Sequence, residues 1–115
     1  MTTRLRILAA ACAVAAAAAA RGDAPARTVE IAARRFQFTP AEVHLRRGET
    51  VRLALHSEDV THGFFQRKLG IDTDVPPGRT TEVVITPREA GRFLVICHHF
   101  CGAGHGGMNL TFVVE

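Results

Sequence analysis

The segment from Cys97 to Met108 constrains the structure of this chain more than any other. It places two thiols, an imidazole and a thioether, from Cys97, Cys101, His105 and Met108, at offsets 0, 4, 8 and 11. Residues at this spacing can share one face of an α-helix. Four glycines in the segment argue against that structure, because each costs a helix about 1 kcal/mol relative to alanine. A glycine-rich loop can instead turn these side chains inward. The ligand types favour copper over magnesium or calcium, so we interpret the segment as a metal-binding loop.

The amino-terminal residues are typical of a secretory signal peptide. Two arginines precede an unbroken apolar run, Ile7–Ala20, and Ala24-Pro25-Ala26 has the small-x-small form of a processing site. As a helix the run would span about 21 Å, less than the hydrocarbon core of a bilayer, which is about 30 Å thick. We therefore predict a signal peptide over residues 1–26 and an exported, periplasmic domain over residues 27–115. Two alternatives stay open: a retained amino-terminal helix that attaches the protein to the outer face of the inner membrane, and a lipidated Cys12.

Removal of the leader changes the charge balance. The full chain has 14 basic and 11 acidic residues, and without residues 1–20 it is nearly neutral. A nearly neutral domain lacks the basic footprint of a nucleic-acid-binding protein, so we expect no nucleic-acid partner. In an oxidising compartment Cys97 and Cys101 could form a disulfide. His105 and Met108 at ligand spacing in the same loop favour metal ligation by the thiolates instead.

The remainder of the domain has the pattern of strands and turns, without a stable helix. Apolar and polar residues alternate in segments such as Val51–His56, which is typical of half-buried strands. About seven such strands predict an all-β, antiparallel β-sandwich. The segment Leu69–Pro77 is predicted to be a loop, and His44 and His56 are predicted to lie on the polar faces of strands. The predicted core aromatic residues are Phe36, Phe38, Phe93 and Phe112.

A further ligand is expected from Ser57–Phe64, where His62 follows directly after a predicted strand. In a sandwich, the loop after one strand and the loop between the last two strands can meet at one end. Two imidazoles, two thiolates and a thioether are too many for one copper, because blue-copper sites use one Cys, two His and a weak axial Met. The extra thiolate implies a second metal ion, with both sulfurs bridging.

The sequence at this point resembles the binuclear copper (CuA) domain of cytochrome c oxidase subunit II, in the cupredoxin superfamily. The loop follows that family's pattern Cys-x3-Cys-x3-His-x2-Met without a gap, and Ser57–Phe64 is similar to the segment that carries its first histidine ligand. Val75–Arg79 and Pro87–Phe93 are similar to its connecting turns. The resemblance covers about Val43–Glu115 and implies a cupredoxin-like Greek-key β-sandwich.

The resemblance also implies six ligands for two copper ions. They are two thiolates, two imidazoles, a thioether and a backbone carbonyl, from Cys97, Cys101, His62, His105, Met108 and His99 respectively. The thiolates would bridge the ions and each imidazole would bind one of them. The thioether and the carbonyl would be weak ligands of different ions. No catalytic residue is implied, since such a centre transfers an electron without bond chemistry of its own.

The function implied by the resemblance is electron transfer, as or like oxidase subunit II. Electrons would come from a cytochrome c-type donor and pass to a haem–copper partner such as oxidase subunit I, and a copper chaperone would load the site. Two departures limit the resemblance. His99 stands where many members have a glutamate that helps to hold magnesium, and the absence of Trp and Tyr removes their electron-accepting aromatic cluster. The chain therefore looks closer to the B-type oxidase subunit II or to a stand-alone CuA protein. The alternative function is a periplasmic copper carrier or sensor that uses the same ligands.

Overall fold

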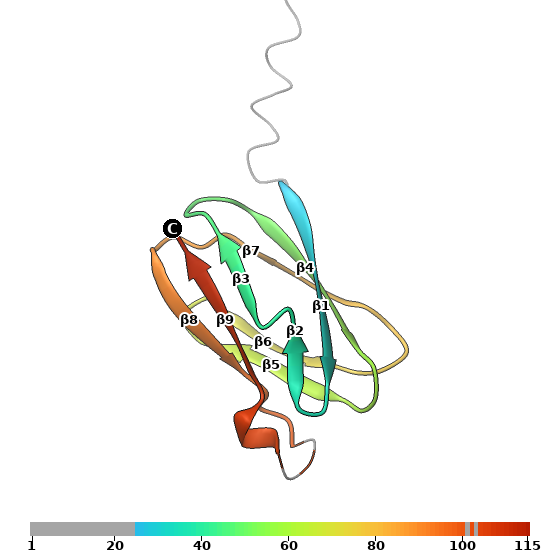
Figure 1. Ribbon diagram of the computed structural model, residues 1–115. Coiled ribbons are helices and arrows are strands. Elements are labelled where there is room, and N and C mark those ends of the chain that lie inside the picture. Colours follow the sequence, from blue (N-terminus) through green and yellow to red (C-terminus); the bar gives the residue numbers. More distant parts are fainter. Residues whose placement is uncertain (1–24, 101, 103) are drawn as a thin grey trace, which may run out of the picture.

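Two β-sheets packed face to face form the domain (Figure 1). The computed structural model describes residues 25–100, 102 and 104–115. The strands are β1 (Arg27–Arg34), β2 (Gln37–Thr39), β3 (Glu42–Leu45), β4 (Val51–Ser57), β5 (His62–Gln66), β6 (Ile71–Val75), β7 (Thr81–Ile85), β8 (Gly91–Ile96) and β9 (Asn109–Val114). A single turn of 3-10 helix, η1 (His105–Gly107), lies between β8 and β9. The predicted all-β sandwich is confirmed. The predicted signal or anchor segment, residues 1–26, lies outside the described residues except for its last two positions.

The strand order is β2-β1-β4-β7 in one sheet and β3-β9-β8-β5-β6 in the other. Most neighbouring strands are antiparallel, but β1 and β4 are parallel, as are β3 and β9. These two parallel pairs are exceptions in a sandwich that is otherwise antiparallel, as predicted. The chain changes sheets at Pro40, between β2 and β3, where proline supplies no backbone donor to continue a ladder. β2 runs antiparallel to β1. After the chain has crossed to the other sheet and returned, β4 pairs with the free side of β1 and runs parallel to it.

Alternating side chains of both sheets fill the core. Val51, Leu53 and Leu55 on β4 are almost fully buried, as their alternation predicts. The ring of Phe64 makes edge contacts with two other buried rings: its centroid lies 5.3 Å from that of Phe38 and 6.3 Å from that of Phe112. Such pairs contribute about 0.5–1.5 kcal/mol beyond the burial of their area.

Two local predictions were wrong. Phe36 is 40% exposed rather than buried, because it lies in the turn between β1 and β2. The segment predicted as a loop contains β6, in which Ile71 and Val75 face the core and Asp72 and Asp74 face solvent. This strand is at the edge of its sheet, where exposed charged side chains oppose pairing with another chain.

The two ends of the sandwich differ in what they carry. The β8–β9 loop, the β1–β2 turn and the β4–β5 turn lie at the lower end in Figure 1. The start of β1 and the end of β9 lie at the upper end (Figure 1). Among the described residues, no helix is long and apolar enough to cross a membrane.

Candidate metal centre

His62 is the first residue of β5 and its side chain is fully buried. Its Nε2 lies 2.7 Å from Oδ1 of Asp59. Nδ1, on the other side of the ring, is a buried atom without a hydrogen-bond partner. A carboxylate accepts hydrogen bonds only, so this contact places the proton on Nε2 and leaves the lone pair of Nδ1 available. A hydrogen bond of this kind orients a histidine that binds a metal through its other nitrogen.

Asp59 is held by the turn between β4 and β5. Its carboxylate accepts the backbone N–H of Arg35 at 2.9 Å and that of Val60 at 2.7 Å. Ser57 supports the same turn, since its hydroxyl donates to the carbonyl of Val60 and accepts the N–H of Asp59. Desolvation opposes the charged carboxylate, but the hydrogen bonds from Arg35, His62 and Val60 outweigh it and lower the pKa of Asp59 to about 2. Asp59 is therefore an anion at neutral pH, and it fixes the ring of His62.

Cys97 follows β8 directly and is 3% exposed. The backbone N–H of Gly63 donates to its Sγ at 3.3 Å, and Sγ lies 3.2 Å from the carbonyl oxygen of His99. The first of these hydrogen bonds holds the sulfur against the start of β5. It also places the residue after His62 directly beside the predicted sulfur ligand.

Gly63 permits this close approach. A Cβ at this position would lie 2.3 Å from Nδ1 of His98 and 2.8 Å from the backbone nitrogens of His98 and His99. Any side chain would therefore force the start of the metal loop away from β5. The spacing of the ligands in the sequence does not predict this requirement for glycine at position 63.

Met108 is 1% exposed and follows η1. Its carbonyl oxygen accepts the backbone N–H of Cys97 at 3.3 Å, which ties the two ends of the loop together. Within the loop, the N–H of Gly107 donates to the carbonyl of Gly104 at 3.1 Å. The loop is thus closed at its base, with a sulfur ligand candidate at each end.

The structure brings four of the six predicted ligand groups to one end of the sandwich. These are the imidazole of His62, the sulfur of Cys97, the carbonyl of His99 and the thioether of Met108. Cys101 lies outside the described residues, and only the backbone of His105 is described. Within residues 25–100, 102 and 104–115, no three His, Cys, Asp or Glu side chains form a group able to hold a metal ion.

The described donors fit copper. An available imidazole nitrogen, a buried sulfur that accepts a backbone N–H and a buried thioether are soft or borderline ligands of the type that copper prefers. All three belong to side chains with at most 3% exposure, so water has little access to them.

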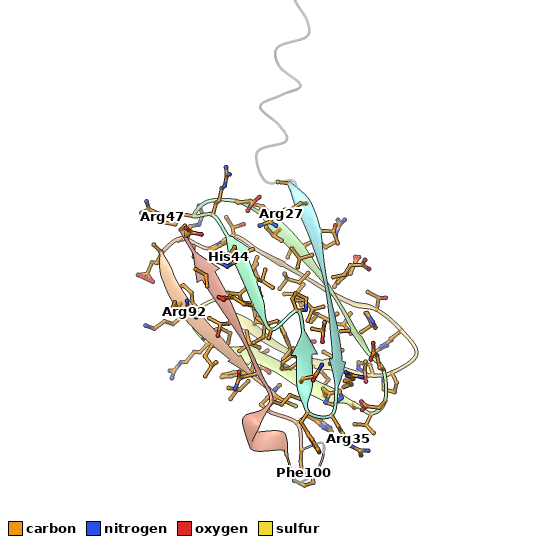
Figure 2. The ribbon with its side chains drawn as sticks, in the orientation of Figure 1. Arg27, Arg35, His44, Arg47, Arg92 and Phe100 are labelled. Atoms are coloured by element: carbon orange, nitrogen blue, oxygen red, sulfur yellow. The ribbon has the colours of Figure 1, made fainter. Side chains whose placement is uncertain are left out.

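Phe36 is a contributor to the site that the sequence did not reveal. Its ring covers the glycine-rich loop: a Cβ on Gly104 would lie 2.7 Å from the ring, and one on Gly102 would lie 2.9 Å from it. Phe100, which is 74% exposed, lies at the same lower end of the molecule near Arg35 (Figure 2). The end of the domain that carries the loop therefore presents aromatic surface, although Trp and Tyr are absent.

The other histidines have different surroundings. Nε2 of His98 lies 2.8 Å from a carboxylate oxygen of Asp72 on β6, and its ring lies beside that of Phe65. His44 is on the exposed face of β3, with Nδ1 3.3 Å from the carboxylate of Glu115. The predicted surface position of His44 is confirmed.

Comparison with known proteins identifies a domain family with the same fold and, among the relatives, proteins of one named kind. The model of the cupredoxin-like domain matches residues 5–108. Cytochrome c oxidase subunit 2 of Thermus thermophilus is 33% identical over 88 residues, which are 76% of this chain. The chain spans 65% of the length of that relative and 52% of a second Thermus thermophilus protein of the same name.

Solved structures agree. The periplasmic domain of cytochrome oxidase subunit II from Bradyrhizobium japonicum superposes with a TM-score of 0.71 at 19% identity, covering 76% of this chain and 83% of that one. A heme-copper terminal oxidase dimer contains a chain with the same TM-score at 25% identity, covering 99% of this chain and 76% of that one. The chain belongs to the cupredoxin-like domain family, and cytochrome c oxidase subunit II proteins are among its relatives.

Proposed function

We propose that this chain is an exported electron-transfer protein with a binuclear copper centre, acting as or like cytochrome c oxidase subunit II. The observation that carries the proposal is the buried Nδ1 of His62, which has no partner while Nε2 is held by Asp59. The backbone next to it donates to the sulfur of Cys97. A buried nitrogen without a hydrogen-bond partner costs free energy unless a cation binds its lone pair.

The proposed ligands are the six groups implied by the loop pattern. They are His62, Cys97, Cys101, His105 and Met108 through side chains and His99 through its carbonyl. Two coppers sharing two thiolates would store and release one electron with little change in ligand geometry. The protein contributes rigidity to that process, because its described ligands lie at the ends of paired strands and are held by hydrogen bonds.

The partners that we propose are a cytochrome c-type donor, a haem–copper acceptor such as oxidase subunit I, and a copper chaperone. The proposal of an acceptor is supported by relatives named cytochrome c oxidase subunit 2 and by the likeness to a chain of a heme-copper terminal oxidase dimer. The aromatic rings of Phe36 and Phe100 at the loop end offer contact area to either redox partner.

The test is reconstitution of the chain with copper. We expect two tightly held coppers per chain and a mixed-valence absorption spectrum. Cys101→Ser should abolish that spectrum, because one bridging sulfur is lost. Met108→Leu should retain it with a changed reduction potential. Reduced cytochrome c should transfer one electron to the loaded protein.

Two histidine variants are matched controls. His99→Ala keeps the backbone carbonyl, and His44→Ala removes a histidine at the opposite end, so both should retain two coppers. Uptake of a single copper, or its ready exchange with a chelator, would contradict electron transfer and favour a copper carrier or sensor. A mixed-valence spectrum in Cys101→Ser would refute the double-thiolate bridge.

A further inference from the structure

His98 directly follows the first sulfur ligand candidate in the chain, and its ring lies across the β5–β6 hairpin. Nε2 of His98 is 2.8 Å from Oδ1 of Asp72 on β6. The ring centroid is 5.3 Å from that of Phe65 on β5, with 36° between the two ring planes. The side chain of His98 is 32% exposed, less than half the value of 68% for Asp72. A residue of the metal loop therefore contacts both strands of a hairpin that lies outside the loop.

The pairing of the strands explains how one ring can reach both. Phe65 on β5 pairs with Ile96 on β8. The same antiparallel register, continued by two residues, places His98 opposite Gly63. On the other side of β5, Phe65 pairs with Asp72. Alternation puts these side chains on the same, outward face of the sheet, so the ring of His98 passes over β5 at Gly63 to reach β6.

Gly63 leaves the space that this path needs. A Cβ there would lie 2.3 Å from Nδ1 of His98, so a side chain at position 63 would displace the ring. The ring in turn covers the glycine, and a cross-strand aromatic ring of this kind compensates for the missing side chain. The same glycine donates its N–H to Sγ of Cys97.

Two neighbouring loop residues thus hold one glycine from opposite faces of the sheet. Sγ of Cys97 reaches Gly63 from the core side, where Cys97 is 3% exposed, and the ring of His98 reaches it from the outer side. This fixes the start of the loop, where Sγ of Cys97 lies 3.2 Å from the carbonyl oxygen of His99. We call the arrangement the hairpin clasp; its residues are Gly63, Phe65, Asp72 and His98.

We propose that His98 is a positioning residue of the copper centre, which holds Cys97 and the carbonyl of His99 in place through the hairpin clasp. This role rests on the proposed function, since it concerns the same ligands, but the clasp consists of protein groups alone. Ligands that are already in position lose less conformational freedom when the metal binds. Groups that support ligands in this way also set the affinity of a metal site.

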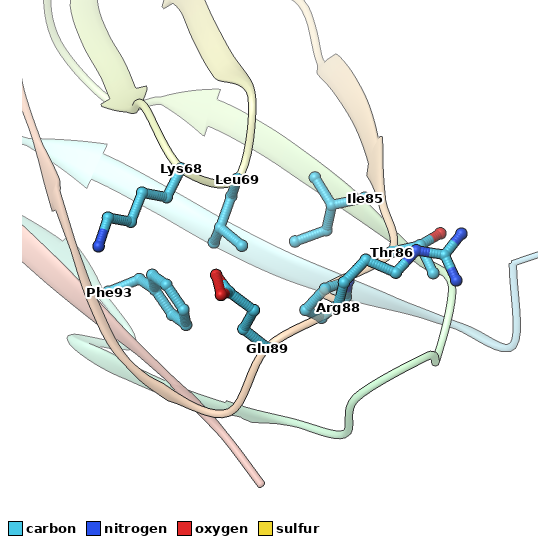
Figure 3. Close-up of a pocket in the computed structure, with 8 residues that line it drawn as sticks. Lys68, Leu69, Ile85, Thr86, Arg88, Glu89 and Phe93 are labelled. Carbon is cyan, nitrogen blue, oxygen red and sulfur yellow. The ribbon is translucent and has the colours of Figure 1, made fainter.

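The turn of the same hairpin lies beside open space. Lys68 and Leu69 line a hollow of about 100 Å³ together with Glu89, in the β7–β8 loop, and Phe93 on β8 (Figure 3). Lys68 is exposed and is not part of the clasp. Its replacement therefore changes the hairpin without removing a contact of His98.

The first test measures how fast iodoacetamide alkylates Cys97 in the reduced, metal-free full chain, with peptide mass spectrometry to separate Cys97 from the other cysteines. Alkylation requires the start of the loop to open, because Cys97 is 3% exposed. His98→Ala removes the ring contact and the polar contact, so the rate should rise about tenfold. Asp72→Ala removes the polar contact alone, and the rate should rise about threefold. The double variant should react no faster than His98→Ala, because both changes break the same contact.

Asp72→Asn is the conservative variant. Its amide oxygen still presents an acceptor to Nε2 of His98, so the alkylation rate should stay close to that of the unchanged chain. A rate as high as that of Asp72→Ala would contradict the polar contact between His98 and Asp72.

The second test uses the copper-loaded chain. His98→Ala should change the reduction potential and release copper to a chelator about tenfold faster, at the lower end of the range for lost support of metal ligands. The metal-free variant should retain cooperative unfolding in urea, which separates displaced ligands from an unfolded domain.

Two variants are matched controls. His44→Ala also removes an imidazole beside a carboxylate, that of Glu115 at 3.3 Å, but on β3. Lys68→Ala changes the turn of the same hairpin. Neither should alter the alkylation of Cys97, the release of copper or the potential.

Equal acceleration in either control, additive effects in the double variant, or a copper centre that His98→Ala leaves unchanged would overturn the proposal. The two tests also separate this role from the proposed function. A chain that takes up no copper would contradict the proposed function, while the alkylation pattern would still identify the clasp. Two tightly held coppers without that pattern would overturn the clasp and leave the proposed function intact.

Discussion

Asp59 controls the chemistry of His62 through one hydrogen bond of 2.7 Å. Asp59→Asn keeps the size of the side chain but removes the charge and lets the amide present a donor to Nε2. We expect copper affinity to fall about 10–100-fold, the range typical of lost partners of metal-binding histidines. Competition with a chelator measures this affinity. Glu58→Gln is the control, because it neutralises the neighbouring exposed carboxylate; an equal loss there would show a general effect of charge.

The low pKa of Asp59 also predicts how the metal-free protein responds to acid. Its pKa is about 2 in the folded chain and about 3.9 when unfolded. The ionised form is favoured by folding, so its contribution is complete above about pH 4 and disappears as the pH falls towards 2. Partial exposure reduces this contribution to about 1–2 kcal/mol. Urea unfolding between pH 4 and pH 2.5 should show a steeper loss of stability than in Asp59→Asn; parallel curves would contradict the assignment.

At the scale of elements, the β1–β2 turn supports the metal loop through Phe36. Gly104→Ala places a methyl group 2.7 Å from that ring, and we expect a loss of about 1–3 kcal/mol in the free energy of unfolding. In the background of Phe36→Ala the same change should cost little, because the obstacle is gone. Urea denaturation of the four proteins gives the coupling energy.

The control for this cycle is Gly106→Ala in the same loop. A Cβ at Gly106 meets nothing within 4 Å, so this variant should be neutral or slightly stabilised. Equal destabilisation by both alanines would assign the effect to loop flexibility and not to the ring of Phe36.

The sequence predicted the strands in which apolar and polar residues clearly alternate, but it did not predict β6 or the contacts between distant segments. Val51, Leu53 and Leu55 predicted β4 and its buried face, and the structure confirms them. β6 was missed because only Ile71 and Val75 are apolar in an otherwise polar segment. The spacing of the loop predicted the ligands, but the contacts of Phe36 and Gly63 arise from segments distant in sequence, which no spacing rule relates.

At the scale of the whole molecule, the core and the metal loop are separable. The buried apolar residues come almost entirely from the strands, and the loop adds only Cys97 and Met108 among those described. We therefore expect the metal-free domain to stay folded, with a β-rich circular dichroism spectrum and cooperative unfolding. Bound copper should add about 4 kcal/mol when its free concentration is 1,000 times the dissociation constant.

Leu53→Ala separates the two contributions. Leu53 is fully buried on β4, so its truncation should cost about 2–5 kcal/mol. The loss should be equal in metal-free and copper-loaded protein, because distant and independent sites are additive. Thermal and urea unfolding of both forms measures it. A metal-free chain without cooperative unfolding, or a Leu53→Ala loss that depends on copper, would mean that the metal organises the sandwich itself and that the strands alone do not.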